Sequence, residues 1–413
     1  MKQRRATHEI DHEAAALAAA GHIAQLFYQQ TLQNRQATLL WTNDGNRMIP
    51  VRRSDVAEWV SLYARGLSAL NIARGARIAL IGTPSDVRLK MILGHALAGM
   101  TTIALADDLP IEDRIRLLDQ SHVSVLIAEN AREALPYLQE GGSMPELQML
   151  ISLQGTLNLP HRHMNFYNLD EVISRGRSQP DRTSQWLQTL RKDDAALLIG
   201  ARRMAEAGED DHAMPVELTM KTHAELMQSC ETIRTILSES GHALADDQNP
   251  IVVHGYFHHV ADFIACQILP LTLTRSISYL SNKLGDMEHY HQLQPQLLIS
   301  DSDYIVQLHQ RLERLLTQES DGIDNFMART LFRLGKKRYE KSGKMSGLEK
   351  LLFNITFQSV SNRVRRCIGS KLKVILSVDE QIPYPTQLFF ETFGVRMVEI
   401  PAVFEKALEK IRL

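Results

Sequence analysis

The loop that runs from Gly200 to residue 218 is the segment whose surroundings point most directly to chemistry. An apolar run at 195–199 precedes it, and a helix is expected to begin near Thr222. A strand, a loop and a helix N-terminus together form a common site for a nucleotide phosphate, because backbone N–H groups at such a place attract anions. The order of elements therefore predicts the scaffold of a phosphate site.

The side chains of this loop do not supply the chemistry that the scaffold would need. Phosphate-binding loops are rich in Gly, Ser, Thr and Lys. This loop has two glycines, Gly200 and Gly208, and neither a hydroxyl side chain nor a lysine before residue 219. Three consecutive carboxylates would repel a triphosphate by charge: Glu209, Asp210 and Asp211. We therefore expect no cofactor-binding and no catalytic residues here.

The elements around the loop read as an alternation of strands and helices. Helices are expected at 54–70, 85–98 and 111–120, and strands at 77–81, 101–105 and 123–127. Strands separated by helices of this length predict parallel βαβ units with right-handed crossovers. Asp44-Gly45, between two strand-like runs, predicts a hairpin. The fold class is therefore α/β, with parallel βαβ sheets covered by helices.

Three regions follow from this pattern: an N-terminal helical segment (1–35), a first α/β lobe (36–190) and a second α/β lobe (191–413). Residues 140–192 show little periodicity and are expected to be a loop-rich connection. A strand at 296–299 and a helix at 303–316 follow in the second lobe. A chain of 413 residues is long enough to bury a substantial core.

Composition is ordinary for a soluble globular protein, with 44% hydrophobic and 23% charged residues. The formal net charge of −2 gives no general attraction to nucleic acid. Three widely spaced cysteines show no metal-binding pattern and suit a reducing cytoplasm. The most apolar run, at 251–273, contains three histidines, an aspartate and a proline, which argues against a membrane span.

The order of these elements, with Thr222-His223 after the loop, resembles the adenylate-forming (AMP-binding) superfamily, most closely its long-chain fatty acyl-CoA synthetase branch. Those enzymes have a Ser/Thr/Gly-rich phosphate loop that ends in Pro-Lys-Gly. Here Pro215 is kept and the Lys-Gly pair is absent. The resemblance covers about residues 30–400 and implies the fold of the large N-terminal domain of these enzymes.

Two later family motifs are also altered. Where the family has Ser-Gly-Gly against adenine, this chain reads Ser377-Val378-Asp379. Where the family has Gly-Tyr-Gly-Leu-Thr-Glu, the aligned residues end in Glu405, and Pro401 is expected to begin an amphipathic helix that places Glu405 on the surface. The sequence has no counterpart of the C-terminal cap domain, so the resemblance implies a degenerate and truncated member of the superfamily.

A candidate acyl pocket follows the strand expected at 250–253. The family has a histidine near its acyl and nucleotide pocket, and His259 aligns with it, so the resemblance assigns Tyr256, Phe257 and His259 to this pocket. The alternative is that His258 and His259 cap or pack at a strand-to-helix junction. Two i, i+2 histidine pairs, at 161/163 and 289/291, have no further ligands nearby, and we expect no metal site.

The region from Arg329 to Lys373 is strongly basic, with apolar residues between the charges, and only Glu340 and Glu349 oppose them. It resembles the long-chain synthetase segment that lies next to the membrane, and basic residues are attracted to anionic lipid. A solvated helix face is the alternative. Nucleic acid is not expected, since no recognised motif supports it. The candidate membrane or partner patch comprises Arg333, Lys336, Lys337, Arg338, Lys341, Lys344, Arg363, Arg365 and Arg366.

These observations predict a catalytically inactive acyl-CoA synthetase-like protein that binds an acyl ligand or a protein partner, without a cofactor. The alternative is a divergent fatty acyl-activating enzyme, an acyl-AMP or acyl-CoA ligase, that uses ATP and Mg²⁺ and gains its missing groups from a partner subunit. The sequence leaves a homo- or hetero-oligomer open. The expected location is the cytoplasm, with peripheral attachment to the inner membrane face through the basic patch.

Overall fold

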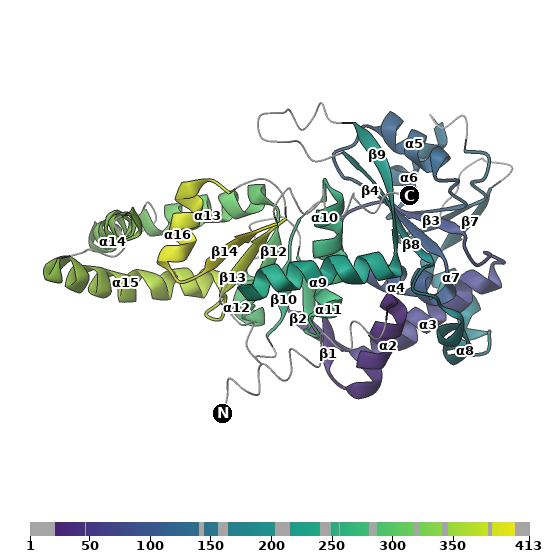
Figure 1. Cartoon of the computed structure of the whole chain (residues 1–413), viewed down its shortest axis with the longest axis horizontal. Helices are drawn as coiled ribbons and strands as arrows, with labels where there is room; N and C mark the ends of the chain where they lie inside the picture. The colour runs from purple at the N-terminus through teal and green to yellow at the C-terminus, as the bar shows by residue number, and fades with distance from the viewer. Residues whose placement is uncertain are drawn as a thin grey trace.

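Two seven-stranded sheets form the framework of the computed structural model (Figure 1). The structure describes residues 21–45, 47–139, 144–155, 164–202, 215–239, 249–255, 257–280, 287–317, 322–340, 346–378 and 382–400. Strands β1 and β2 pair antiparallel, as do β8 and β9, and the other strand pairs run parallel. The predicted α/β class with parallel βαβ units is confirmed.

One sheet has the strand order β7-β6-β5-β3-β4-β8-β9. Its strands are β3 (Arg77–Leu80), β4 (Thr101–Leu105), β5 (Val125–Ala128), β6 (Met149–Ser152), β7 (Asn165–Asn168), β8 (Ala195–Arg202) and β9 (Val216–Thr222). Strands β4, β5 and β6 are buried along their whole length, and β8 along most of it. Continuous burial is typical of parallel strands that helices cover on both faces.

The second sheet has the strand order β14-β13-β12-β10-β11-β1-β2. Its strands are β1 (Thr38–Asn43), β2 (Met48–Arg52), β10 (Ile251–Val253), β11 (Ile277–Tyr279), β12 (Leu297–Ser300), β13 (Val374–Ser377) and β14 (Arg396–Glu399). The predicted hairpin at Asp44-Gly45 joins β1 to β2, with Gly45 at φ 103°. The two sheets draw on different stretches of the chain, and the boundaries of the predicted lobes remain a prediction.

Helices surround both sheets. They are α2 (Ile23–Gln33), α3 (Arg53–Ala69), α4 (Asp86–Ala98), α5 (Ile111–Gln120), α6 (Ala131–Gln139), α7 (Leu169–Arg177), α8 (Thr183–Thr189), α9 (His223–Glu239), α10 (Val260–Phe263), the π-helix η2 (Ile264–Ile268), α11 (Leu269–Thr272), α12 (Met287–Leu293), α13 (Ser302–Thr317), α14 (Gly322–Glu340), α15 (Gly347–Ile368) and α16 (Tyr384–Thr392). No helix in the described ranges is long and apolar enough to cross a membrane.

Helix α4 shows how the local sequence sets these boundaries. The Ser85 hydroxyl accepts the N–H of Arg88 at 3.2 Å and so satisfies one of the first-turn amides. Gly99 ends the helix at φ 69°, a left-handed conformation that glycine adopts without strain. The helix predicted at 85–98 is therefore confirmed.

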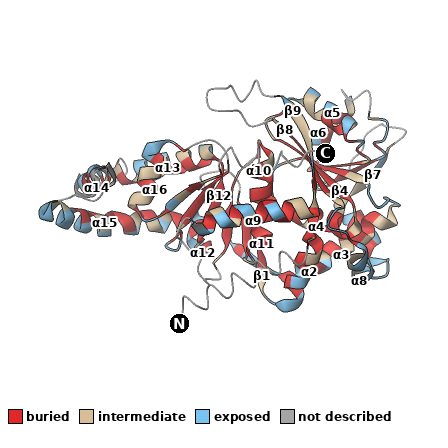
Figure 2. Cartoon of the chain, in the orientation of Figure 1, coloured by how far each residue is buried: buried red, intermediate tan, exposed pale blue. Residues whose placement is uncertain are grey.

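The hydrophobic core has two parts. Buried residues, red in Figure 2, lie in the strands of both sheets. The larger part contains the buried side chains of the first sheet. It continues between the two sheets, where it includes residues of α9 and η2. The smaller part lies between the second sheet and helices α12 to α16. The larger part includes residues of both sheets, such as Leu105 of β4 and Leu376 of β13. Shared apolar packing thus holds the two sheets together.

Two expectations about local structure are wrong. Residues 140–192, expected to be loop-rich, contain β6, β7, α7 and α8, and a capping box of Asn168 and Glu171 begins α7. The loop after Gly200 leads into strand β9 before the helix. The Glu225 carboxylate then accepts the Thr222 N–H at 2.7 Å, and the Thr222 hydroxyl accepts the Glu225 N–H at 3.2 Å, which begins α9. Residues 203–214 of the loop lie outside the described residues.

Candidate functional site at the strand ends between the sheets

The carboxyl ends of strands from both sheets meet at one place. Asp107, just after β4, exchanges two hydrogen bonds with Phe257, which follows β10. The Asp107 N–H donates to the Phe257 carbonyl at 3.0 Å, and the Phe257 N–H donates to Asp107 Oδ2, also at 3.0 Å. Ligands of open α/β proteins commonly bind at the carboxyl ends of parallel strands. This junction is therefore the candidate functional site.

Asp107 lies among cations of the first sheet and its helices. Burial raises the pKa of Asp107, and the Phe257 N–H and the charges of Arg88 and Arg114 act against that rise. Arg88 is buried on α4, where burial lowers its pKa to about 10, and it donates to the Leu80 carbonyl at 3.0 Å. The Asp107 carboxylate thus supplies negative charge that a buried guanidinium requires.

Replacing Asp107 with Ala is expected to lower the free energy of unfolding by about 2 kcal/mol, because the Phe257 N–H loses its acceptor. Asp107→Asn should lose much less, because the amide oxygen still accepts this N–H and burial already disfavours the charged carboxylate. Urea denaturation measures both changes. Asp113→Ala is a further control, because Asp113 forms a 2.7 Å ion pair with Arg116 on an exposed face, and such a pair contributes less than about 1 kcal/mol. Equal losses in Asp107→Ala and Asp107→Asn would contradict this account.

Asp108 links the next strand end to the histidine segment. Its Oδ2 lies 3.1 Å from Arg202 Nε, at the end of β8, and its Oδ1 lies 3.5 Å from His258 Nδ1. Burial alone would raise the pKa of Asp108, but His258 and Arg202 outweigh burial and lower the pKa to about 2. Arg202 is the last residue of β8, directly before the loop where the order of elements predicted the scaffold of a phosphate site. Its guanidinium is paired with this carboxylate.

The histidines themselves begin α10. Asp262 Oδ2 accepts the N–H of His258 at 3.0 Å and that of His259 at 2.8 Å. His259 is buried, and its Nδ1 lies 3.2 Å from the Arg202 carbonyl oxygen. Phe257 is buried in the core, with its ring centroid 5.0 Å from that of Phe263. These contacts fit capping and packing at a strand-to-helix junction. The acyl-pocket assignment remains a prediction, and Tyr256 lies outside the described residues.

Two apolar side chains are buried at the carboxyl ends of β13 and β14. Val378 is fully buried, and its N–H donates to the Ser300 carbonyl at 3.1 Å. The Ile400 N–H donates to the Ser377 carbonyl at 3.2 Å, and the Ile400 side chain is also buried. Where the resemblance implies adenine-binding glycines, this chain therefore has a β-branched core residue. Residues 379–381 and 401–413, including Glu405, lie outside the described part of the chain.

The predicted basic patch divides into two kinds of residue. Arg333 and Arg366 are exposed. Arg363 donates to the Leu315 carbonyl at 3.1 Å, and Arg365 donates to the carbonyls of Ser370 at 2.7 Å and Phe393 at 2.9 Å. These two half-buried arginines tie α15 to its neighbours. The other five patch residues have side chains outside the described part of the structure: Lys336, Lys337, Arg338, Lys341 and Lys344.

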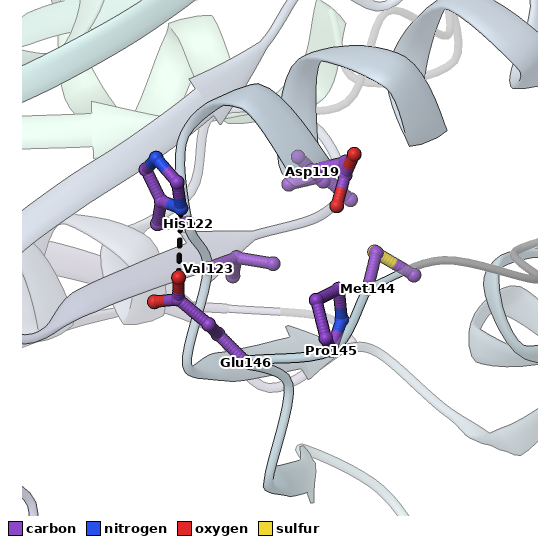
Figure 3. Close-up of a pocket in the computed structure, with 7 residues that line it drawn as sticks. Asp119, His122, Val123, Met144, Pro145 and Glu146 are labelled. Carbon is purple, nitrogen blue, oxygen red and sulfur yellow. Dashed lines mark hydrogen bonds and ion pairs between the residues drawn. The ribbon is translucent and has the colours of Figure 1, made fainter.

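A small cavity beside α5 offers little room for a ligand. Its volume is about 10 Å³, and it is lined by Leu118, Asp119, His122, Val123, Met144, Pro145 and Glu146 (Figure 3). That volume holds about one water molecule. An exposed contact of 2.7 Å between His122 Nδ1 and Glu146 Oε1 borders it. Neither a nucleotide nor an acyl chain fits there.

A metal site finds no support among the described side chains, where no group of three or more His, Cys, Asp or Glu residues could hold an ion. His289 and His291 lie on α12, and His289 is buried while His291 is exposed. The histidines at 161 and 163 lie outside the described residues.

Sequence reasoning missed Asp107, Asp108, Arg88 and Arg114. One signal was present, because the two aspartates directly follow the apolar run at 101–105, where polar residues mark the end of a strand. Their partners are distant, since Arg202 is 94 positions from Asp108 and Phe257 is 150 positions from Asp107. Only the arrangement of the two sheets brings these residues together.

Comparisons with known proteins bear on the fold. No protein-family model matches the sequence, and no curated protein matches it either. The adenylation domain of a carboxylate reductase from Mycobacterium chelonae is similar in structure, with a TM-score of 0.67 and 13% identity over 96% of this chain and 62% of that chain.

Two further solved structures agree with this match. The adenylation domain of a carboxylic acid reductase from Segniliparus rugosus, in complex with AMP and a co-purified carboxylic acid, has a TM-score of 0.66 and 15% identity, with 97% of this chain and 65% of that chain covered. The anthranilate CoA ligase AuaEII, in complex with anthranoyl-AMP, has a TM-score of 0.59 and 13% identity, with coverages of 91% and 58%.

This chain spans less than two thirds of the length of each of these three structures. Within that span it has the α/β fold of the large N-terminal domain of adenylation enzymes, as the resemblance predicted. The assignment to the long-chain branch remains a prediction.

Proposed function

We propose that this chain is a non-catalytic protein with the adenylation-enzyme fold, which binds an acyl ligand or a protein partner instead of forming an adenylate. The observation that carries the proposal is that this chain's own side chains occupy the strand ends where a nucleotide would lie. Val378 is buried in the core there, and the Arg202 guanidinium is paired with Asp108 at 3.1 Å. Both side chains serve the packing of this chain itself.

The sequence of the adjoining loop supports the same proposal. A triphosphate is stabilised by lysine, by hydroxyl groups and by glycine-rich backbone that can approach it closely. Residues 203–214 contain no lysine, serine or threonine, and their acidic residues are Glu206, Glu209, Asp210 and Asp211. Like charges repel, so these four carboxylates oppose the binding of an anion next to the loop.

No adenylate formation is expected with any fatty acid. A pyrophosphate-exchange assay on the purified protein tests this directly, with an active adenylation enzyme and its own acid as the positive control. Exchange that depends on both ATP and a fatty acid, above that of a heat-denatured sample, would overturn the proposal. ATP with Mg²⁺ is also expected to leave the melting temperature unchanged, whereas a ligand at 100 times its dissociation constant adds about 2.7 kcal/mol.

The alternative function is a divergent acyl-activating enzyme that a partner subunit completes. The observation in its favour is that the strand ends of both sheets meet at one place. His259 Nδ1 lies there, 3.2 Å from the carbonyl oxygen of Arg202 at the end of β8. The same assay separates the two functions when it is repeated on protein isolated together with its native partners. Exchange that appears only in that complex supports the alternative.

The acyl ligand is tested by native mass spectrometry of the purified chain. A bound fatty acid or acyl conjugate would appear as a defined mass increment that is removed by organic extraction. Pull-down from the source cells identifies a protein partner in the same preparation. A chain that carries neither an acyl ligand nor a stoichiometric partner would contradict both forms of the proposal.

A further inference from the structure

Helix α15 has an apolar stripe that the described part of the chain leaves uncovered. Leu348, Leu351, Leu352 and Ile355 are between 41% and 68% exposed. Their spacing is i, i+3, i+4 and i+7, which places them on one face of a helix. The residues that α15 buries lie on a different face: Phe353, Thr356, Val360 and Val364. The first half of α15 therefore has apolar side chains on two faces. The described part of the chain covers only one of these faces.

The position of the stripe narrows what could cover it. The first half of α15 extends away from the sheets at the end of the molecule, at the left of the view (Figure 1). Exposed residues dominate this end in Figure 2. An exposed apolar patch of this kind commonly marks an interaction site. Because the helix projects from the molecule, its apolar side chains could insert into a broad surface.

The charge of this region also helps to decide which partner covers the stripe. Residues 322–373 contain thirteen Lys or Arg and three Asp or Glu. Arg329, Arg333 and Lys350 are exposed on α14 and α15. A second copy of the chain would bring two such cationic segments together, and like charges repel. An anionic lipid surface attracts the cations and also offers hydrocarbon to the stripe.

We propose that the first half of α15 docks this protein on an anionic lipid surface. Leu348, Leu351, Leu352 and Ile355 enter the boundary between headgroups and acyl chains, and the cations of α14 and α15 lie over the headgroups. A surface-bound amphipathic helix gains binding from both buried apolar area and electrostatic attraction. This inference is independent of the function proposed at the strand ends, because none of these residues belongs to that site.

Vesicle co-sedimentation tests the stripe. Vesicles of equal parts phosphatidylglycerol and phosphatidylcholine are expected to bind the full chain, and pure phosphatidylcholine vesicles are expected to bind it far more weakly. The double variant Leu348→Gln, Leu351→Gln should bind the anionic vesicles at least about tenfold more weakly, because two large aliphatic side chains no longer leave water. Glutamine is a good helix former, so α15 should persist.

A matched control removes the same kind of exposed side chain elsewhere. Leu32 on α2 and Met220 on β9 are also exposed, and the double variant Leu32→Gln, Met220→Gln should bind anionic vesicles as the unmodified chain does.

A third variant reverses the charges of Arg329, Arg333 and Lys350 to Glu. It should lose binding at low salt, while added salt should weaken binding of the unmodified chain because exposed charges are screened within about 8–10 Å.

A second readout serves if the stripe variant fails to fold. Leu351→Trp keeps an apolar side chain, and its fluorescence should shift to the blue when anionic vesicles are added, as expected for an indole that leaves water. Four results would overturn the proposal: no binding to anionic vesicles, equal binding to neutral ones, unchanged binding by the stripe variant, or no shift of the tryptophan. A dimer in sedimentation velocity that the stripe variant abolishes would overturn it as well, in favour of a second copy.

Discussion

Lowering the pH from 7 to 4.5 is expected to remove several kcal/mol from the free energy of unfolding. The loss comes from buried histidines that are neutral in the folded chain. Burial lowers the pKa of His22 to about 4 and that of His95 to about 3, from an ordinary value of 6.5. Burial also lowers the pKa of His223 well below 6.5, and the neighbouring His22 adds to that effect.

The sign follows from which state binds more protons. Between pH 6.5 and about 4 the unfolded histidines are protonated and the folded ones are neutral, so the free energy of unfolding rises with pH. This stability is fully present above pH 6.5 and is lost as the pH falls toward the folded pKa values. By linkage, the pKa values of His22 and His95 correspond to a loss of about 2.5 kcal/mol for each of these two histidines at pH 4.5. Protonation of Asp107 and Asp301, whose pKa values burial raises, offsets part of the loss.

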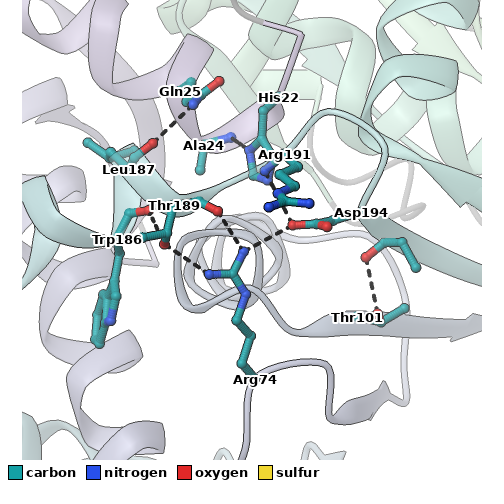
Figure 4. Close-up of polar contacts among 11 residues, drawn as sticks. His22, Ala24, Gln25, Arg74, Thr101, Trp186, Leu187, Thr189, Arg191 and Asp194 are labelled. Carbon is teal, nitrogen blue, oxygen red and sulfur yellow. Dashed lines mark hydrogen bonds and ion pairs between the residues drawn. The ribbon is translucent and has the colours of Figure 1, made fainter.

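The contacts of these histidines explain why they stay neutral. The rings of His22 and His223 stack with centroids 3.5 Å apart, and both are buried. His22 Nδ1 accepts the Ala24 N–H at 3.2 Å and so caps α2. In the same cluster Arg74 and Asp194 form an ion pair of 3.1 Å (Figure 4). Asp194 raises the pKa of His22 and Arg74 lowers it, so burial decides the outcome.

Urea denaturation between pH 7.5 and 4.5 measures this dependence, and His22→Asn isolates one contributor. Asparagine can still accept the Ala24 N–H, because it is a preferred N-cap residue, but it does not titrate. The variant should reduce the slope of the free energy of unfolding by up to about 1.4 kcal/mol per pH unit. The exposed His122 is the control, and asparagine tolerates its φ of 51°. Equal slopes in the chain and both variants would refute the assignment.

The parallel framework could be predicted from the sequence because several inner strands are short apolar runs with a helix before and after them in the chain. Strand β4 (Thr101–Leu105) and strand β5 (Val125–Ala128) are examples, since burial on both faces requires apolar residues without alternation. The hairpin at Asp44-Gly45 was predictable for a different reason, the positive φ at Gly45. These signals are local, so they need no knowledge of the remainder of the fold.

Strand β9 was missed although its sequence contains a signal. Val216, Leu218 and Met220 alternate with polar residues, which is the period of a strand. The expectation of a loop followed by a helix left no place for it. In the structure Met220 is exposed and Lys221 is buried, so the alternation does not report the usual apolar core face. Pairing with β8 holds the strand in place instead.

The polar site at the strand ends could not be predicted, because its contacts join distant parts of the chain. Asp108 lies close to Arg202 and His258 because the carboxyl ends of β4 and β8 in one sheet meet that of β10 in the other. The resemblance assigned His259 to an acyl pocket, which stays a prediction, and it could not show that Asp262 accepts the N–H groups of His258 and His259. Hydrogen bonds of this kind depend on where two sheets meet, and no spacing in the sequence encodes that place.

The crossing of α3 and α7 depends on two glycines, and an alanine at either position is expected to cost about 3 kcal/mol or more. A Cβ atom on Gly176 would lie 1.9 Å from the Leu62 carbonyl oxygen, and one on Gly66 would lie 2.1 Å from the Val172 carbonyl oxygen. Both obstacles are backbone atoms inside helices, so they cannot move aside as a flexible side chain would. The two helices must separate, which opens the core that Val172 fills.

Alanine is favoured over glycine within a helix by about 1 kcal/mol, so the propensity alone predicts stabilisation at these positions. A loss in Gly176→Ala therefore isolates the steric term. Gly347, at the start of α15, is the control, because a Cβ atom there meets nothing within 4 Å and Gly347→Ala should be neutral or slightly stabilising. The double variant Gly66→Ala, Gly176→Ala should lose less than the sum of the single losses, since helices separated by one methyl group already accommodate the other. Additive losses in urea denaturation would mean that the two glycines act at independent contacts, contrary to the geometry of this crossing.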